Sequence, residues 1–317
     1  MKAKTGYNPA DMSLWQGRID SEEGSAARRW HQQILPVSAP QAPGVVLLGL
    51  ACDAGVKRNL GRSGAAGGPA ALRAAAANLA WHLTDPLYDG GDVSCRDDEL
   101  EIAQQLYAEQ VAARLGEGHR VIGLGGGHEI AYGSFRGLVD HLGRHNDKPR
   151  IGIVNFDAHL DLRQSARASS GTPFNQCASL CEEMGIPFQY TCIGVSRNNN
   201  TRALFDRARQ LDTEVVLDEQ LNGWDLSPLI VALDKAAAGA DYLYVTLCLD
   251  VLPGQVAPGV SAPAGRGMEL SLLEYAIDRL KRSNKVLMAD IAELNPDCDQ
   301  HSQTARVAAR LLERLAR

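Results

Sequence analysis

Residues 151–161 read Ile-Gly-Ile-Val-Asn-Phe-Asp-Ala-His-Leu-Asp, and this stretch decides the fold prediction. Its first six residues form a nearly continuous apolar run, which is typical of a strand covered on both faces. Side chains at i, i+2 and i+4 of extended backbone share one side, so Asp157, His159 and Asp161 should converge beyond the strand. Ligands of open parallel sheets bind at the carboxyl ends of the strands. The stretch therefore predicts a buried parallel strand that ends in a candidate cation site.

Similar apolar runs recur along the chain and alternate with alanine- and leucine-rich helical patterns. This alternation predicts an α/β fold, a mostly parallel sheet with helices on both faces. The first 44 residues carry a weaker pattern and are expected to wrap the domain, so residues 1–317 are predicted to form one domain. The expected strands are 45–50, 120–124, 151–156, 190–195, 214–217, 242–249 and 285–291. The clearest helical patterns start at Pro69 and cover Glu99–Leu115 and Ser302–Leu315.

Composition excludes several classes of protein. The 317 residues carry 32 Lys and Arg against 38 Asp and Glu, a net charge of -6, and no basic stripe that would bind nucleic acid. No apolar run approaches the ~20 residues that span a bilayer, and the amino terminus has no apolar signal core. Seven scattered cysteines then suggest reduced thiols in the cytoplasm. A homo-oligomer stays possible.

Two further segments place potential ligands after predicted strands. Gly125-Gly-Gly-His128-Glu129 follows one strand, and Thr246-Leu-Cys248-Leu-Asp250 ends another. Taken singly, such residues are often helix caps, and glycine-rich turns also cradle phosphates. Three fragments at the same edge favour a metal cluster, because clustered buried carboxylates without a cation would repel one another. Carboxylate and imidazole ligands suit Mn²⁺.

These three segments resemble the signature motifs of the ureohydrolases, the superfamily of arginases, agmatinases and formimidoylglutamases. The resemblance runs from about Cys52 to Pro296. It implies a three-layer α/β/α arginase-like fold and a dinuclear manganese centre whose bridging hydroxide attacks an amidine or guanidine carbon. The ligands that carry over by motif position are His128, Asp157, His159, Asp161 and Asp250.

The resemblance also implies catalytic residues. Glu293 matches the family's substrate-facing glutamate, which would hold the cationic nitrogen of the substrate. Glu293 and the ligand Asp157 are therefore the expected catalytic residues. The alternative interpretation of Glu293 is a solvated loop carboxylate.

Cys248 departs from the family pattern, which has Asp at both acidic positions of the third segment. The position usually provides a bridging carboxylate, whereas a thiolate is softer and suits Zn²⁺ better than Mn²⁺. Three outcomes are open: a dinuclear site with a weakened second metal, a single-metal enzyme, or a different metal. The set of His128, Asp157 and Asp161 is intact and predicts one firm metal position, with Cys248 as a further candidate ligand.

Several stretches resemble formimidoylglutamases in particular, namely residues 55–69, 169–174 and 260–263. Arg163 fits this resemblance, because a substrate with carboxylates calls for a bidentate guanidinium clamp. Arg62 is expected to act in the same way, or else to pair with a surface acid. The other substrate contacts expected in these loops are Asn59, Ser170 and Thr172.

The function implied is metal-dependent hydrolysis of N-formimidoyl-L-glutamate to L-glutamate and formamide in histidine degradation. Phe174 falls near the position of the arginase histidine that shuttles protons, so the proton donor for the leaving group is not evident. The alternatives are hydrolysis of another guanidino or amidino compound, such as guanidinobutyrate, agmatine or arginine, and a metal-poor relative without catalysis.

Overall fold

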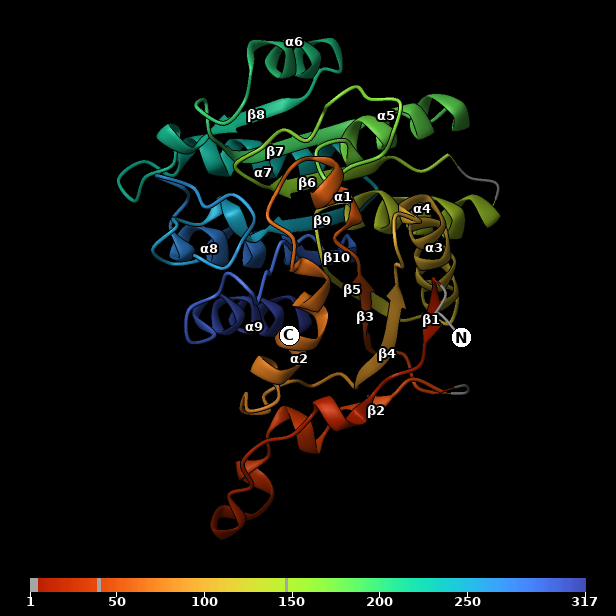
Figure 1. Ribbon diagram of the computed structural model, residues 1–317, viewed down its shortest axis with the longest axis vertical. Helices are drawn as coiled ribbons and strands as arrows, with labels where there is room; N and C mark the ends of the chain where they lie inside the picture. Colours follow the sequence, from red (N-terminus) through yellow and green to blue (C-terminus); the bar gives the residue numbers. More distant parts are fainter. Residues whose placement is uncertain (1–4, 39–40, 146–147) are drawn as a thin grey trace.

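A computed structural model of the protein describes residues 5–38, 41–145 and 148–317. Within these residues ten strands form one sheet in the order β1-β4-β3-β5-β10-β9-β6-β7-β8, with β2 also paired to β4 (Figure 1). All neighbouring strands are parallel except β1 and β4. The mostly parallel sheet is thereby confirmed. The strands are β1 Gly6–Asn8, β2 Leu35–Pro36, β3 Val45–Ala51, β4 Leu87–Ser94, β5 Arg120–Gly125, β6 Ile151–Phe156, β7 Gln189–Val195, β8 Glu214–Leu217, β9 Tyr242–Cys248 and β10 Val286–Ala292.

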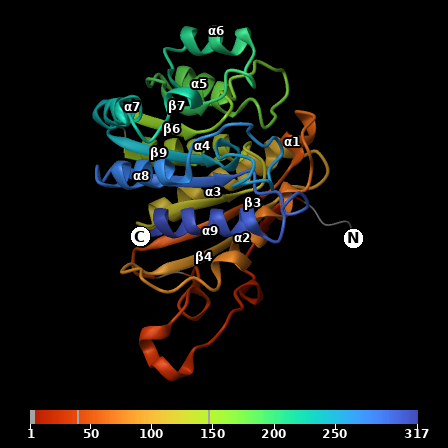
Figure 2. The ribbon, with the colours of Figure 1, turned by 90° about the vertical axis from the view of Figure 1, so that its left-hand side faces the viewer.

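Helices cover both faces of the sheet and complete the expected three layers (Figures 1 and 2). One buried apolar cluster lies between the sheet and α2, α7, α8 and α9, and a second lies between the sheet and α3, α4, α5 and α6. No helix in the described ranges is long and apolar enough to cross a membrane. The helices are α1 Ala54–Arg58, α2 Gly68–Ala76, α3 Leu100–Gly116, α4 Ile130–Leu142, α5 Pro173–Met184, α6 Arg202–Gln210, α7 Ser227–Gly239, α8 Leu270–Lys281 and α9 Gln303–Ala316.

All seven strands expected from the sequence are present, whereas β4 and the short strands β1 and β2 were missed. The sequence of β4, Leu-Tyr-Asp-Gly-Gly-Asp-Val-Ser, contains five residues that favour turns. Arg73 of α2 explains the strand: its guanidinium lies 2.8 Å from Asp89 and 2.7 Å from Asp92. Arg73 and Asp89 are 1% and 0% exposed, and Trp15 also donates to the Asp89 carboxylate, at 2.7 Å. A buried ion pair with a distant helix thus stabilises a segment that has a turn-like sequence.

Replacing Arg73 should therefore be costly. Arg73→Ala leaves the Asp89 carboxylate buried without its cation and is expected to lower the free energy of unfolding by about 3–5 kcal/mol. Urea denaturation followed by circular dichroism measures the change. Arg150→Ala, which removes an exposed ion pair with Asp241, should cost less than about 1 kcal/mol. Equal losses in the two variants would contradict this role of Arg73.

Residues 5–38 lie along the β4 edge of the sheet. β1 and β2 both pair with β4, and Trp15 and Trp30 are buried. Between these two tryptophans the chain projects from the body of the molecule, and the Ile19 side chain there is 67% exposed (Figure 1). The segment therefore extends the edge of the sheet as well as covering part of it.

Candidate metal centre and substrate cavity

The site lies at the carboxyl edge of five adjacent strands, β3, β5, β10, β9 and β6. Because these strands are parallel, the segments that follow them meet at one place. His128 follows β5, Asp157 follows β6, Asp250 follows β9 and Glu293 follows β10. The loop after α1, with Asn59, follows β3. The order of the strands thus brings together residues that are far apart in the sequence.

Close packing of the chain explains the glycines before His128. A Cβ on Gly126 would lie 1.8 Å from the Cys52 carbonyl oxygen, and one on Gly127 would lie 2.4 Å from Val56 Cγ2. The Gly127 amide donates to the same Cys52 carbonyl at 2.9 Å. The residues after β3 can approach the turn after β5 this closely only because side chains are missing there. The turn therefore presents His128 over the edge of the sheet.

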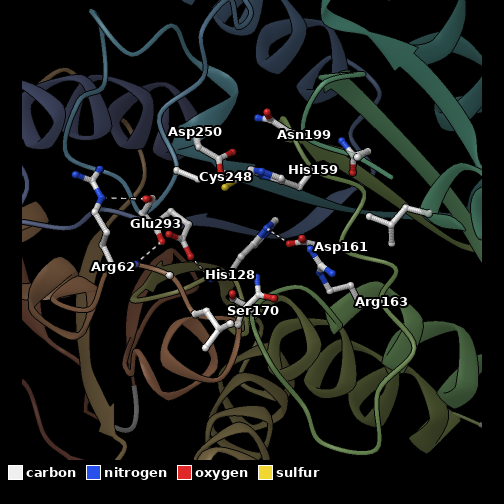
Figure 3. A pocket seen from close by; sticks show the side chains of 17 residues that line it. Arg62, His128, His159, Asp161, Arg163, Ser170, Asn199, Cys248, Asp250 and Glu293 are labelled. Carbon is white, nitrogen blue, oxygen red and sulfur yellow. Dashed lines mark hydrogen bonds and ion pairs between the residues drawn. The ribbon is translucent and has the colours of Figure 1, made fainter. Parts of the chain in front are cut away.

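Asp157 contacts both predicted histidine ligands. Figure 3 shows the other five predicted ligands at the cavity, namely His128, His159, Asp161, Cys248 and Asp250. His128 Nδ1 is 2.9 Å from Asp157 and 3.0 Å from Asp161. His159 Nδ1 is 3.1 Å from Asp250 and 3.4 Å from the other oxygen of Asp157. Two groups offer ligand atoms within 4.8 Å of one another, and both contain Asp157. They are His128, Asp157 and Cys248, and Asp157, His159 and Asp250.

Neighbouring polar side chains orient these ligands. His128 Nε2 lies 3.0 Å from the Thr246 hydroxyl, which leaves Nδ1 directed at the carboxylates. Asn200 accepts from the Leu160 amide at 2.9 Å and donates to the Ala158 carbonyl at 2.9 Å, so it fixes the segment that carries the ligands. Asn200 was not predicted from the sequence, because a single asparagine after a strand belongs to no motif that would indicate a role.

When no cation is bound, the negative charges of the carboxylates can be balanced only by protons that they share with the imidazoles. Burial opposes ionisation of the imidazoles, but hydrogen bonds that His128 donates to Asp157 and Asp161 raise its pKa well above 6.5. Asp250 and Asp157 do the same for the pKa of His159, again against burial. Burial and the charge of Asp157 raise the pKa of Asp161 to about 6. Three carboxylates and two imidazoles that hold protons in this way fit divalent cations, which would replace those protons.

Cys248 occupies the position expected for a ligand. It is the last residue of β9, is 2% exposed and lines the cavity. Burial, together with the charges of Asp157 and Asp250, raises the pKa of its thiol well above 9. The cysteine is therefore protonated at neutral pH in this cluster, and only a bound cation would favour the thiolate.

Glu293 is held in an unusual backbone conformation. Its φ of 73° lies in the left-handed region, where residues other than glycine are uncommon. Two contacts fix it: its amide donates to the Gly126 carbonyl at 2.8 Å, and its Oε1 accepts from the His128 amide at 3.0 Å. Oε2 is buried without a hydrogen-bond partner, and burial, with the charge of Asp250, raises the pKa of Glu293 to about 8. The alternative of a solvated carboxylate is wrong, because the residue is 4% exposed.

A cavity of about 300 Å³ opens above these residues. Of the predicted substrate contacts, Asn59, Arg62, Arg163 and Ser170 line it. Thr172 does not belong to the lining; it is 2% exposed, and its hydroxyl accepts from the Ser169 amide at 2.9 Å. Thr172 thus stabilises the loop that contains Ser170.

The two predicted arginine clamps differ in their contacts. Arg62 donates to the carbonyls of Val260 and Ser261, the latter at 3.0 Å, so it ties two loops together rather than pairing with a surface acid. No hydrogen bond or ion pair holds the Arg163 guanidinium within the described part of the chain. A Cβ on Gly171 would lie 2.9 Å from Arg163 Cδ, so the glycine leaves space for this side chain. Arg163 is the arginine at the cavity that is free to bind an anion.

Two other positions lie in the cavity or behind it. Asn199 reaches the cavity from the loop after β7 and was missed, because nothing in the sequence distinguishes it within Asn198–Asn200. Phe174, expected near the position of a shuttle histidine, is fully buried. It stacks on Tyr190 with ring centroids 4.5 Å apart, and its ring centroid lies 5.5 Å from that of His128 in an edge-to-face arrangement. It packs behind a ligand and carries no titratable group.

The sheet and the cluster define an α/β protein with a buried carboxylate–imidazole site for divalent cations beside a polar cavity. Comparison with known proteins gives the family. The sequence profile described as Arginase family matches residues 43–316, and the chain belongs to this family.

Relatives and solved structures agree with this assignment. A formimidoylglutamase of Aeromonas hydrophila subsp. hydrophila is 52% identical over 312 residues, which cover 98% of each chain. The crystal structure of formimidoylglutamase from Bacillus subtilis superposes with a TM-score of 0.83 at 22% identity, over 95% of this chain and 93% of that one. That of Trypanosoma cruzi formiminoglutamase with Mn²⁺₂ has a TM-score of 0.76 at 25% identity, over 88% and 95% of the two chains.

Proposed function

We propose that this protein hydrolyses N-formimidoyl-L-glutamate to L-glutamate and formamide, as part of histidine degradation. The observation that carries the proposal is that a guanidinium and a buried carboxyl line opposite sides of the cavity. The exposed Arg163 guanidinium, which has no partner within the residues that the structure describes, lies on one side, and the buried, unpartnered oxygen of Glu293 lies on the other (Figure 3). A substrate with carboxylates at one end and a cationic amidine at the other matches this arrangement. The names of the relatives support the same substrate over agmatine or arginine.

We propose that the ligand cluster holds two Mn²⁺ ions. His128, Asp157 and Asp161 would hold one ion, and His159 and Asp250 would hold the second with Asp157 shared. Two such ions supply a water nucleophile at neutral pH, because they lower the pKa of a shared water. The T. cruzi formiminoglutamase, whose crystal structure contains Mn²⁺₂, supports manganese, and the oxygen and nitrogen donors of this cluster suit that ion.

The side chains of the cavity would orient the substrate for attack. Glu293 would accept hydrogen bonds from the cationic formimidoyl nitrogen, and its fixed backbone would keep that group beside the ligands. Arg163 would bind a carboxylate of the glutamate portion in a bidentate manner. Arg62 would contribute indirectly, because it fixes the loop at Ser261 that forms one wall.

Cys248 is expected to weaken one metal position. A thiol with a raised pKa competes poorly for Mn²⁺, so Cys248→Asp should increase the affinity for the weaker ion by about tenfold, or about 1.4 kcal/mol. Titration with Mn²⁺, followed by electron paramagnetic resonance of the free ion, measures both affinities. Cys298→Ser, at a half-buried cysteine that lines none of the cavities described, serves as control. Unchanged affinities in Cys248→Asp would mean that the cysteine does not limit the site.

Arg163→Gln tests the proposed substrate. The variant keeps a polar side chain but loses the cation, so KM for formimidoylglutamate should rise by roughly 10- to 100-fold, the equivalent of a charge-assisted hydrogen bond of about 1.5–3 kcal/mol. Steady-state kinetics with formimidoylglutamate, guanidinobutyrate and agmatine measure the effect on each compound. Arg197→Gln, at an exposed arginine paired with Glu219, should behave like the wild type. Turnover of agmatine or arginine but not formimidoylglutamate would overturn the assignment.

We also propose that the protein works in the cytoplasm, where thiols stay reduced. All seven cysteines are free in the structure, in agreement with a reducing compartment.

A further inference from the structure

A second cavity, of about 660 Å³, adjoins the first. It lies between the end of α1, the loop 162–169 and the start of α6. Three residues, Asn59, Arg163 and Leu204, line both cavities and form the boundary between them. None of the candidate metal ligands lines the second cavity, so the reaction itself does not account for it.

The lining of this second cavity is strongly basic. Four arginines line it, Arg58, Arg163, Arg167 and Arg207, and no acidic side chain is among the other residues of the lining. Two of the four are neutralised by acids that lie outside the cavity lining. Arg58 is 2.6 Å from both Asp98 and Glu101, and Arg167 also pairs with Asp98.

The other two arginines keep their charge available. Arg207 is half-buried and donates to the amide oxygen of Asn175 at 2.8 and 3.0 Å, so a neutral group holds it in place. The acid nearest in sequence, Asp206, is instead paired with Arg202 and Arg209. Arg163 has neither an ion pair nor a hydrogen bond on its guanidinium among the described residues. A concave site with two such cations and a low-dielectric wall concentrates anions.

We propose that this second cavity is an antechamber that binds dicarboxylates of about the size of glutamate and passes them to the catalytic cavity through Arg163. The inference rests on the proposed function, because it assigns the anionic end of that substrate a first binding place. Arg207 would hold one carboxylate by the guanidinium N–H groups that Asn175 does not occupy. Arg163 borders both cavities and would keep a carboxylate bound as the amidine end moves toward Glu293. The product glutamate would leave by the same path.

Arg207→Gln tests the antechamber through kinetics. At low ionic strength the substitution should lower kcat/KM for formimidoylglutamate by about tenfold, which is the lower end of the electrostatic effects on association rates. KM should change and kcat should not. The difference in kcat/KM between the variant and the wild type should shrink as the salt concentration is raised from 20 to 300 mM, because the higher concentration shortens the screening length to below about 8 Å. Arg202→Gln is the matched control, since Arg202 lies on the same helix, is 93% exposed on its side chain and lines neither cavity. It should change kcat/KM by less than twofold.

Direct binding separates this proposal from the proposed function. Glutarate has two carboxylates and no amidine, and its affinity for the metal-free protein can be measured by isothermal titration calorimetry. Arg207→Gln should weaken glutarate binding at least fivefold, whereas Arg202→Gln should leave it unchanged. Equal affinities and equal salt dependence in the two variants would overturn the antechamber. Weaker glutarate binding in Arg207→Gln, with no hydrolysis of formimidoylglutamate by the wild type, would keep the antechamber and refute the proposed substrate.

Discussion

Asp157→Asn is expected to abolish measurable hydrolysis and to reduce the bound Mn²⁺ from two ions to one or none. Both groups of potential ligands contain Asp157, so the substitution removes a carboxylate oxygen from each. Loss of a residue that only supports a ligand typically lowers metal affinity or activity 10- to 100-fold. Loss of a shared ligand should therefore lower kcat by more than about 100-fold. In the wild type the Asp157 carboxylate accepts a hydrogen bond from the His159 amide at 2.7 Å. The carboxamide of Asn has the same size, and its oxygen can still accept that bond.

Metal content measured by atomic emission, beside kcat and the circular dichroism spectrum, checks this expectation. Asp241→Asn is the control, because Asp241 is an exposed acid whose side chain pairs with Arg150. The variant should keep both metals and full activity. A folded Asp157→Asn protein that keeps two Mn²⁺ ions and wild-type kcat would exclude Asp157 as the shared ligand.

The central part of the sheet and the clustering of the candidate ligands were predictable, because both follow from short-range patterns. A buried parallel strand appears as a continuous apolar run, and parallel strands that end at one edge bring their next residues together. His128, Asp157 and Asp250 therefore lie where the sequence places them, although 122 residues separate the first from the last. The glycines at 125–127 could be interpreted in the same way, as a turn that comes close to another part of the chain.

Other features depended on contacts between distant residues. β4 has a turn-like sequence and becomes a strand because Arg73 neutralises the buried Asp89 and the partly buried Asp92. Arg62 was expected to clamp a carboxylate or pair with an acid, and instead it donates to the carbonyls of residues 260–261. An arginine in a loop has the same sequence signal in all three roles, so only the tertiary structure distinguishes them. Thr172 is similar, because its hydroxyl is used within its own loop.

Glu293→Gln is expected to lower kcat/KM for formimidoylglutamate by about 10²–10³-fold, as for loss of one preorganised electrostatic contact in an active site. The change is nearly isosteric and keeps an acceptor for the His128 amide, so the local backbone should persist. What disappears is the negative charge that would face the cationic formimidoyl group. Steady-state kinetics with metal-loaded protein measure the loss, and a fall of less than threefold would exclude a charged role for Glu293.

The pKa of Glu293 gives this variant a second, independent readout. In the free cavity burial raises this pKa to about 8, so the carboxyl is mostly protonated at pH 7. A bound cation favours the carboxylate and lowers the pKa again, so substrate binding should release a proton. Calorimetry in buffers of different ionisation enthalpy should detect that proton in the wild type and not in Glu293→Gln.

Stability separates loss of charge from loss of structure in the same variant. A carboxyl whose folded pKa of about 8 exceeds its unfolded value near 4.5 binds more protons when folded, so its contribution to stability declines as the pH rises through this range. Glu293→Gln removes that decline, and the metal-free variant should be at least as stable as the wild type at pH 8. Glu129→Gln is the matched control, because Glu129 is equally buried, has a pKa raised to about 7 by burial and lies outside the cavity lining. Both variants should gain stability at high pH, and only Glu293→Gln should lose activity by more than tenfold, because only Glu293 faces the substrate.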